Sequence, residues 1–255
     1  MNVIDPASEA GKFFALIYGD SGTGKTHFAA TLGELGRVLI IDPDQGYMTV
    51  VNAPDLLANK KIQSNVTIAS FSKFKDLDGA YKLIAKNDPA AWSKALGTEI
   101  TEPFDWVVWD TWSEIQWFMM QELRRKEGLL SGNLGQDIDF RKNVGIQHWG
   151  MLTDLNKLAI EQLKEVTKQG VVSQLFVMQE KIDKDENTST IIKGPAIHGK
   201  MTKEILAYFD VNIHTSSSPT GEWIATTKPK AGWPAKTRLG EGKEVKNPKA
   251  VDFFK

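Results

Sequence analysis

Short apolar runs alternate along the chain with longer amphipathic segments. The runs have the length and the branched and aromatic composition of buried strands. They occupy residues 13–18, 37–42, 66–68, 104–110 and 171–178. Two later runs, 211–214 and 222–227, flank a Ser-Pro-Thr-Gly turn and therefore predict a hairpin.

The segments between these runs have the spacing of helices. Apolar residues recur three and four positions apart, and Gly or Pro residues mark where the segments stop. The helices predicted in this way span residues 27–35, 72–86, 89–96, 112–126, 144–169 and 200–209. Two stretches without either period, 128–143 and 179–197, are predicted as polar loops.

Strands that alternate with helices predict an α/β fold. We expect a mainly parallel, twisted sheet with helices on both faces and a C-terminal β-hairpin. Ligands bind such sheets at the carboxyl ends of the strands. A chain of 255 residues can bury a full core, and we expect a single domain over residues 1–227. Residues 228–255, rich in Lys, Pro and Gly, are predicted to form a basic tail that becomes ordered on contact.

Composition excludes several classes of protein. The chain has no cysteine, which excludes disulfides and thiol nucleophiles, and the spacing of its four histidines suggests no zinc site. Its formal net charge is −1, so any nucleic-acid surface must be local. No apolar run has membrane-spanning length and residues 1–11 contain no signal core, so we expect a cytoplasmic protein without membrane contact.

The segment 19–26 fits the phosphate-binding loop G-x-x-x-x-G-K-[ST] at every fixed position. Its glycines allow backbone conformations in which successive N–H groups face phosphate oxygens, and the following helix adds its positive end. Lys25 is expected to reach the β- and γ-phosphates, and the Thr26 hydroxyl to ligate Mg²⁺. The sequence therefore predicts ATP and Mg²⁺ as cofactors. The predicted nucleotide contacts are Gly19, Asp20, Ser21, Gly22, Thr23, Gly24, Lys25, Thr26 and His27.

Asp110 ends the apolar run 104–110 and is the second candidate on the metal side of the site. We expect it to hold Mg²⁺ through water. The alternative role is to cap the helix that begins near residue 112. In AAA+ motors a catalytic Glu usually follows this Asp, whereas here Thr111 follows. A carboxylate that polarises the attacking water must then come from elsewhere.

The order of these parts from about residue 13 to 227 resembles the RecA-type ATPase core. It is most similar to the phage-encoded RecA-like proteins of single-strand annealing (Sak-type, RecA/RadA-like). The resemblance implies that Asp44, after the strand 37–42, is the catalytic carboxylate and that Gln179 senses the γ-phosphate. The alternatives are a turn-stabilising aspartate after Pro43 and a plain strand-end glutamine.

The same resemblance implies that the loops 128–143 and 179–197 bind single-stranded DNA. Their cations would neutralise phosphates, and their apolar tips would stack on bases. The candidate cations in and next to these loops are Arg141, Lys142, Lys181, Lys184, Lys193 and Lys200. Asp183, Asp185 and Glu186 share the second loop, so a solvated loop with balanced charge is the alternative.

RecA-type assemblies complete their active sites with a cation from the neighbouring subunit. Lys228 and Lys230, or alternatively Arg238, resemble such residues by position, which implies a homo-oligomeric ring or filament. A basic solvated tail or a further DNA contact explains them equally well. The aromatic end, residues 251–255, is a candidate docking segment for a single-strand-binding or replication protein, with a disordered tail as the alternative.

Five tryptophans in predicted strands or helices are interpreted mainly as core, with base stacking as the alternative: Trp106, Trp109, Trp112, Trp117 and Trp149. Trp223 and Trp233 are not assigned to the core.

Together these features predict a Mg²⁺–ATP-dependent ATPase that binds single-stranded DNA and promotes annealing or recombination. A nucleic-acid motor or helicase-loader ATPase on the same core is the alternative, and a non-hydrolysing nucleotide switch stays open. A small-molecule kinase is disfavoured because no arginine-rich lid is evident, and a GTPase because no guanine-binding motif is present.

Overall fold

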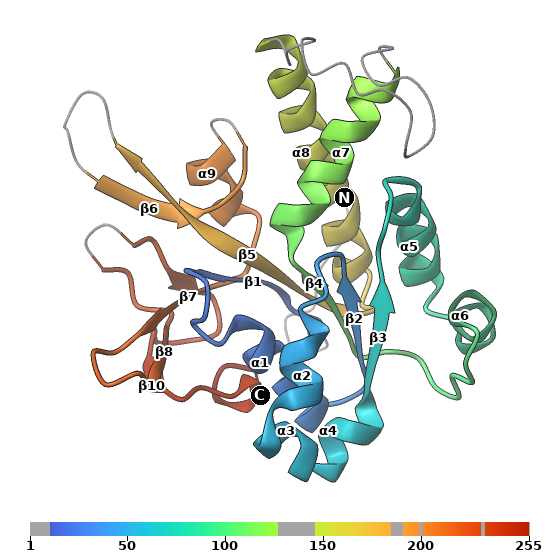
Figure 1. The fold of residues 1–255 in the computed structure, drawn as a ribbon, viewed down its shortest axis with the longest axis horizontal. Helices are drawn as coiled ribbons and strands as arrows, with labels where there is room; N and C mark the ends of the chain where they lie inside the picture. The colour runs from blue at the N-terminus through green and yellow to red at the C-terminus, as the bar shows by residue number, and fades with distance from the viewer. Residues whose placement is uncertain (1–10, 127–145, 185–190, 199–200, 231–232, 255) are drawn as a thin grey trace, which may run out of the picture.

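The computed structural model describes residues 11–126, 146–184, 191–198, 201–230 and 233–254 (Figure 1). The candidate DNA-binding residues Arg141, Lys142 and Lys200 lie outside these described residues. No helix within the described ranges combines the length and the apolar character that crossing a membrane requires.

One mixed sheet forms the centre of the molecule. Its strand order is β10-β8-β7-β1-β5-β4-β2-β3, with β6 added to β5 and β9 added to β7. Five of the strand pairs are parallel: β1 with β5, β1 with β7, β4 with β5, β2 with β3 and β2 with β4. The strands are β1 Phe14–Gly19, β2 Val38–Asp42, β3 Val66–Ser70, β4 Trp106–Asp110, β5 Ser173–Lys184, β6 Ile191–Pro195, β7 Val211–Ser217, β8 Trp223–Thr226, β9 Lys236–Thr237 and β10 Glu244–Lys246.

Helices cover both faces of this sheet, as Figure 1 shows. The group α5–α8 lies on one face and α1–α4 on the other. The α-helices are α1 Lys25–Ala30, α2 Tyr47–Asn52, α3 Pro54–Ala58, α4 Lys60–Asn65, α5 Lys75–Lys86, α6 Pro89–Leu96, α7 Trp112–Lys126, α8 Ile146–Lys168 and α9 Met201–Glu204. Short 3₁₀ turns follow at Thr31–Glu34, Ile205–Ala207 and Ala250–Asp252.

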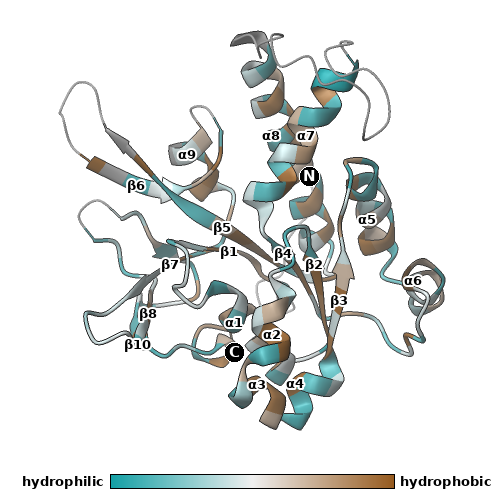
Figure 2. Cartoon of the chain, viewed as in Figure 1, coloured by the Kyte–Doolittle hydropathy of each residue, from teal (hydrophilic) through white to brown (hydrophobic). Residues whose placement is uncertain are grey.

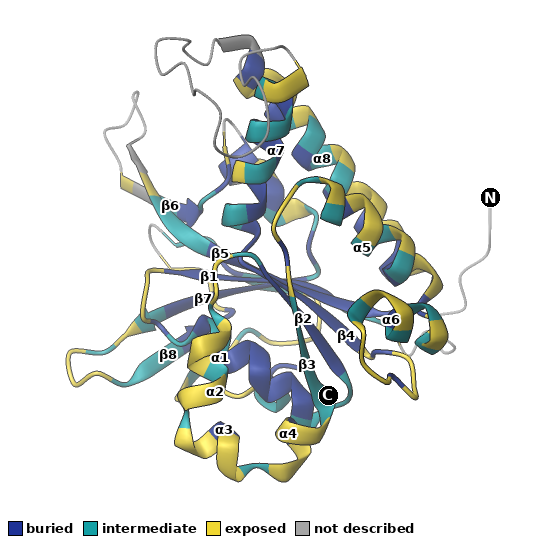
Figure 3. Ribbon diagram, turned by 45° about the vertical axis from the view of Figure 1, so that its right-hand side comes forward, coloured by how far each residue is buried: buried dark blue, intermediate teal, exposed yellow. Residues whose placement is uncertain are grey.

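Alternating strand residues build two hydrophobic layers. In β1, Leu16 and Tyr18 face the α5–α8 layer, whereas Ala15 and Ile17 face α1. Figure 2 shows hydrophobic residues along the strands at the centre of the molecule, and Figure 3 shows that these strands and α1 are buried while α2–α4 are exposed on the outside. The predicted fold class is therefore confirmed: a parallel sheet buried on both faces accounts for the continuous apolar runs.

The predicted polar loop 179–197 is wrong. Strand β5 continues to Lys184, and β6 returns antiparallel to it, with Glu180 opposite Pro195 and Lys184 opposite Ile191. Polar residues are stable in this hairpin because they find distant partners. The Glu180 carboxylate contacts Lys193 Nζ at 3.0 Å and His214 Nε2 at 2.8 Å.

The C-terminal segment also differs from the expected tail. Strand β10 pairs with β8, and Phe253 and Phe254 are buried in the layer that contains α1. The Phe254 ring lies 4.9 Å from Trp106 and 5.5 Å from Phe13, between ring centroids. These two phenylalanines are therefore part of the core of the chain itself rather than a free docking segment. The single domain expected over residues 1–227 stays a prediction.

We expect Phe254→Ala to lower the free energy of unfolding by roughly 3–5 kcal/mol, because the truncation leaves a cavity among three aromatic rings. Urea unfolding followed by circular dichroism measures the change. Leu239→Ala, at a side chain that is 45% exposed in the same C-terminal region, is the matched control and should change little. Equal small effects for the two variants would contradict the packing described.

Candidate nucleotide-binding site

The phosphate loop lies between β1 and α1, as its sequence predicts. Gly22 and Gly24 adopt the left-handed conformation, with φ of 75° and 79°, which side chains disfavour. Gly24 is also the N-cap of α1 and uses no side-chain cap. The loop thus turns at these two glycines, and the positive end of α1 points into the loop.

Lys25 lies along the inside of this loop. Its Nζ donates to the carbonyl oxygens of Gly19 at 2.9 Å and Asp20 at 2.7 Å. Burial lowers the pKa of Lys25, and the carboxylate of Asp110 is the largest influence that raises it. The ammonium is buried within the loop, where a phosphate could exchange for the carbonyl contacts.

Three further strands bring side chains to the loop. Because β2, β4 and β5 run parallel beside β1, their carboxyl ends meet at one edge of the sheet. A cavity of about 280 Å³ lies at this edge. Its lining residues are Ser21, Gly22, Gly24, Lys25, Thr26, His27, Asp44, Gly46, Thr49, Asp110, Thr111, Gln179 and Trp223. The sequence-predicted residues Lys25, Thr26, Asp44, Asp110 and Gln179 are thus brought together.

Three side-chain oxygens in this cavity surround one small volume next to Gly46. A Cβ built on Gly46 would lie 3.3 Å from Asp44 Oδ1, 3.6 Å from Thr26 Oγ1 and 3.8 Å from Asp110 Oδ2. Any larger residue at position 46 would therefore fill the space between these oxygens.

Asp110 is 1% exposed, and its Oδ2 has no hydrogen-bond partner among the described residues. Burial raises the pKa of Asp110 to about 7, with a smaller contribution from Asp44, while a hydrogen bond from Thr26 acts in the opposite direction. A cation beside these groups would compensate the buried charge.

Oxygen donors of this kind fit Mg²⁺. Within the described ranges no three His, Cys, Asp or Glu side chains form a metal cage, so an ion here would need phosphate oxygens to complete its ligands. The residues therefore fit a metal that would arrive with a triphosphate, and Thr26 and Asp110 are the side chains that would hold it.

Asp42 shapes the turn that presents Asp44. Its carboxylate accepts the backbone N–H groups of Asp44 at 3.2 Å, Gly46 at 3.0 Å and Tyr47 at 2.8 Å. Burial and the hydrogen-bonded Asp42 raise the pKa of Asp44 to about 6. The role of Asp42 was not predicted from the sequence, although an acid that ends a buried strand before Pro-Asp is a signal for such a turn.

Gln179 joins the cavity to two neighbouring elements. Its backbone N–H donates to Ser113 Oγ at 3.1 Å, and Ser113 Oγ donates to the Ala196 carbonyl oxygen at 3.2 Å. Ser113 belongs to α7, and Ala196 directly follows β6. Gln179 is therefore fixed where the cavity, α7 and the β5–β6 hairpin meet.

The cations proposed to act between subunits are not among the residues that line the cavity within the described chain. Lys228 is exposed, Lys230 pairs with Glu244 at 2.5 Å, and Arg238 pairs with Asp210 at 2.9 Å. Their role stays a prediction.

The candidate DNA-binding cations that the structure describes belong to the hairpin. Lys181 and Lys184 lie in β5, and Lys193 lies in β6. Lys193 pairs with Glu180 and lies 5.5 Å from the centroid of the Trp233 ring, so its charge is partly compensated.

The interpretation of five tryptophans as core is correct for three of them. Trp106, Trp109 and Trp112 are buried, but Trp117 and Trp149 are 48% and 40% exposed. Both lie on helices that flank the predicted loop 128–143, and the Trp149 ring contacts His198 with centroids 4.8 Å apart. Amphipathic helices also place aromatic residues on their solvent face, and the sequence alone did not separate these two.

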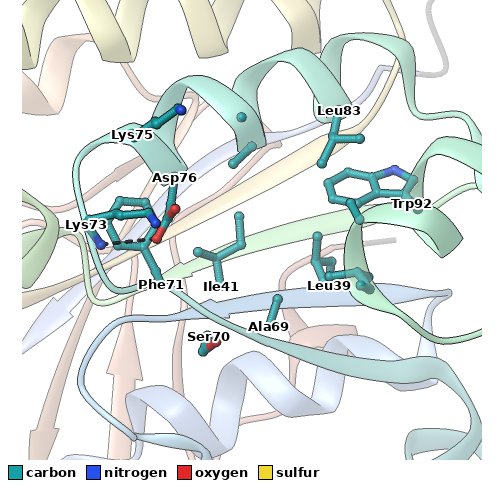
Figure 4. A pocket seen from close by; sticks show the side chains of 14 residues that line it. Leu39, Ile41, Ala69, Ser70, Phe71, Lys73, Lys75, Asp76, Leu83 and Trp92 are labelled. Atoms are coloured by element: carbon teal, nitrogen blue, oxygen red, sulfur yellow. Dashed lines mark hydrogen bonds between the residues drawn. The ribbon is translucent and has the colours of Figure 1, made fainter.

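A second cavity of about 390 Å³ lies between the β2–β3 edge and helices α5 and α6. Figure 4 shows Leu39 and Ile41 facing Leu83 and Trp92 across it, with Lys73, Lys75 and Asp76 at one end. None of the sequence-predicted site residues lines it. The cavity beside the phosphate loop is therefore the candidate site.

In the ligand-free protein, we expect Asp110→Asn to raise Tm at pH 8 by about 3–8 °C. The carboxyl group has a pKa of about 7 when folded and 3.8 as its ordinary value, so its ionisation costs stability. That cost is absent below about pH 4, grows as the pH rises to about 7 and is complete above it. The gain in Tm should therefore disappear near pH 4.

Scanning calorimetry across this range measures the difference. Asp78→Asn, at an exposed carboxylate paired with Lys82 on α5, is the control. A gain that does not depend on pH, or a loss of Tm at pH 8, would contradict the buried charge.

Comparisons with known proteins agree with this geometry. A family described as AAA domain (AAA_24) matches residues 12–239, and no curated protein matches the sequence. A similar solved structure is "Crystal structure of the RadB recombinase", at 13% identity and a TM-score of 0.50, with 92% of this chain and 86% of that chain covered. At that identity the likeness shows the fold alone. The chain belongs to the AAA domain family and has the fold of a RecA-like P-loop ATPase.

Proposed function

We propose that the protein is a Mg²⁺–ATP-dependent ATPase that binds single-stranded DNA and promotes annealing or recombination as a homo-oligomer. The convergence of Lys25, Thr26, Asp44, Asp110 and Gln179 on one cavity is the observation that carries the proposal. The resemblance to phage-encoded annealing proteins of the Sak type supports the finer assignment.

Each side chain in the cavity has a separate role in ATP hydrolysis. Lys25 neutralises the β- and γ-phosphates, and Mg²⁺ supplies charge compensation for the phosphoryl group. Asp44 polarises the attacking water. Its pKa of about 6 leaves it mostly ionised at pH 7.5 while keeping it basic enough to accept a proton. In AAA+ motors a Glu directly after the residue equivalent to Asp110 activates the water. Here that position is Thr111, so Asp44 has this role instead.

Gln179 is positioned to report the state of the γ-phosphate to the DNA-binding elements. A side chain that follows the phosphate would shift the backbone that Ser113 holds, and Ser113 also contacts the residue after β6. The hairpin presents Lys181 and Lys193 together with Ile182 and Ile191, which are 62% and 60% exposed. Cations with exposed apolar side chains suit the phosphates and bases of a single strand.

Assembly completes the proposal. Lys228 and Lys230, or alternatively Arg238, would reach the nucleotide of the next subunit in a ring or filament. Lys228 is exposed, whereas Lys230 and Arg238 would first have to leave their ion pairs with Glu244 and Asp210. The similar solved structure is that of a recombinase, RadB, with which this chain shares its fold. A single-strand-binding or replication protein is a further expected partner.

Asp44→Asn should lower kcat for ATP hydrolysis by about 10²–10⁴-fold, because it removes the general base. Binding of a slowly hydrolysed ATP analogue should change little, whereas Lys25→Ala should abolish it. Steady-state hydrolysis and isothermal titration calorimetry measure the two quantities, with Asp78→Asn as control. Hydrolysis by Asp44→Asn within twofold of the wild type would exclude Asp44 as the base.

Binding of a fluorescein-labelled oligonucleotide, followed by anisotropy, tests the DNA part. We expect binding that needs the ATP analogue and weakens steeply with salt. Trp149 is 40% exposed on α8, which follows the predicted DNA-binding loop 128–143, and we expect it to stack on a base. Trp149→Ala should then weaken binding by about 5-fold or more, as expected for loss of one stacked base. Leu158→Ala, at a 52% exposed side chain of the same helix, should not. Absence of binding at low salt with the analogue present would remove the DNA-binding role, and strand displacement in place of annealing would favour a motor.

A further inference from the structure

Trp223 forms a wall of the nucleotide cavity that the phosphate chemistry does not use. It begins β8 and lies against the phosphate loop: a Cβ built on Gly24 would lie 2.6 Å from Trp223 Cδ2 and 2.7 Å from Cε3. The indole therefore packs directly against the backbone at the start of α1. The ring stays partly exposed in the cavity.

The sheet order places this ring on the opposite side of the loop from the acids. Asp44 follows β2 and Asp110 ends β4, both on one side of β1, whereas β8 lies on the other side beyond β7. One side of the loop thus has carboxylates and the Thr26 hydroxyl, and the other has an uncharged aromatic surface. A nucleoside triphosphate has the same two parts, a charged tail and a flat aromatic base.

His27 holds the indole in place. Its ring centroid lies 4.8 Å from that of Trp223, with the planes tilted by 56°. His27 is itself fixed through a 2.8 Å contact between Nε2 and Asp55 Oδ2. Its Nδ1 has no hydrogen-bond partner among the residues described, so a polar group remains unused on the same side of the cavity.

We propose that Trp223 stacks on the base of the nucleoside triphosphate whose phosphates lie in the loop 19–26. Every base has a π-face, so the stack adds affinity with little selectivity between purines. The inference rests on the proposed function, because it assigns the second part of the same ligand.

Comparison of two ligands separates base stacking from support of the loop. Isothermal titration calorimetry with Mg²⁺ would measure the affinity for a slowly hydrolysed ATP analogue and for inorganic tripolyphosphate, which has no base. Trp223→Leu fills the space without a ring, and we expect it to weaken the ATP analogue between about 5- and 150-fold. Its affinity for tripolyphosphate should stay within twofold of the wild type.

Two further variants complete the test. Trp223→Phe keeps a stacking ring and should retain most of the affinity for the ATP analogue, and Trp117→Ala, at an exposed tryptophan of α7, should change neither ligand. Parallel losses for both ligands in Trp223→Leu, or no loss for either, would overturn the role in base binding while leaving the proposed ATPase intact. A wild-type protein that binds neither ligand would overturn the proposed function and this inference together.

Discussion

The buried carboxylate of Asp110 is the constraint on which the site depends. It is 1% exposed, one of its oxygens has no hydrogen-bond partner among the described residues, and its pKa is raised to about 7. A buried acid in this state stabilises the protein only when positive charge compensates it. Lys25 supplies part of that charge, and the oxygens of Thr26 and Asp44 lie near the same spot, where a bound cation would supply more.

The parallel sheet explains why these groups meet. Lys25 and Asp44 follow β1 and β2, Asp110 ends β4 and Gln179 lies in β5, and all four positions are at the same edge of the sheet. The strand β5 then continues past that edge into the β5–β6 hairpin. The next residue, Glu180, faces the other side of the sheet, where it pairs with His214 and Lys193. Neighbouring residues of one strand thus serve the cavity and the hairpin, which gives nucleotide binding a direct physical route to the hairpin.

Much of the fold and of the site could be predicted because the signals are local. The phosphate loop specifies its own conformation through Gly22 and Gly24, and buried parallel strands are continuous apolar runs whatever they pack against. The resemblance to the RecA-type core identifies Asp44 and Gln179, and both line the cavity.

What could not be predicted depends on distant partners. The hairpin contains polar residues such as Glu180, whose partners lie 13 and 34 positions away. Phe254 is buried only because Phe13 and Trp106 are there to cover it. Trp223 becomes a wall of the cavity through the order of the strands, and Asp42 acts through three backbone N–H groups. No sequence pattern near Glu180, Phe254 or Trp223 indicates such contacts.

A crystal structure with a slowly hydrolysed ATP analogue and Mg²⁺ tests the central claim most directly. We predict the triphosphate within the loop 19–26, beside Lys25, and the metal between it and the side of the cavity that holds Thr26 and Asp110. An analogue bound elsewhere, or a cavity that stays empty at saturating nucleotide while Asp44 and Asp110 face away from it, would contradict the claim.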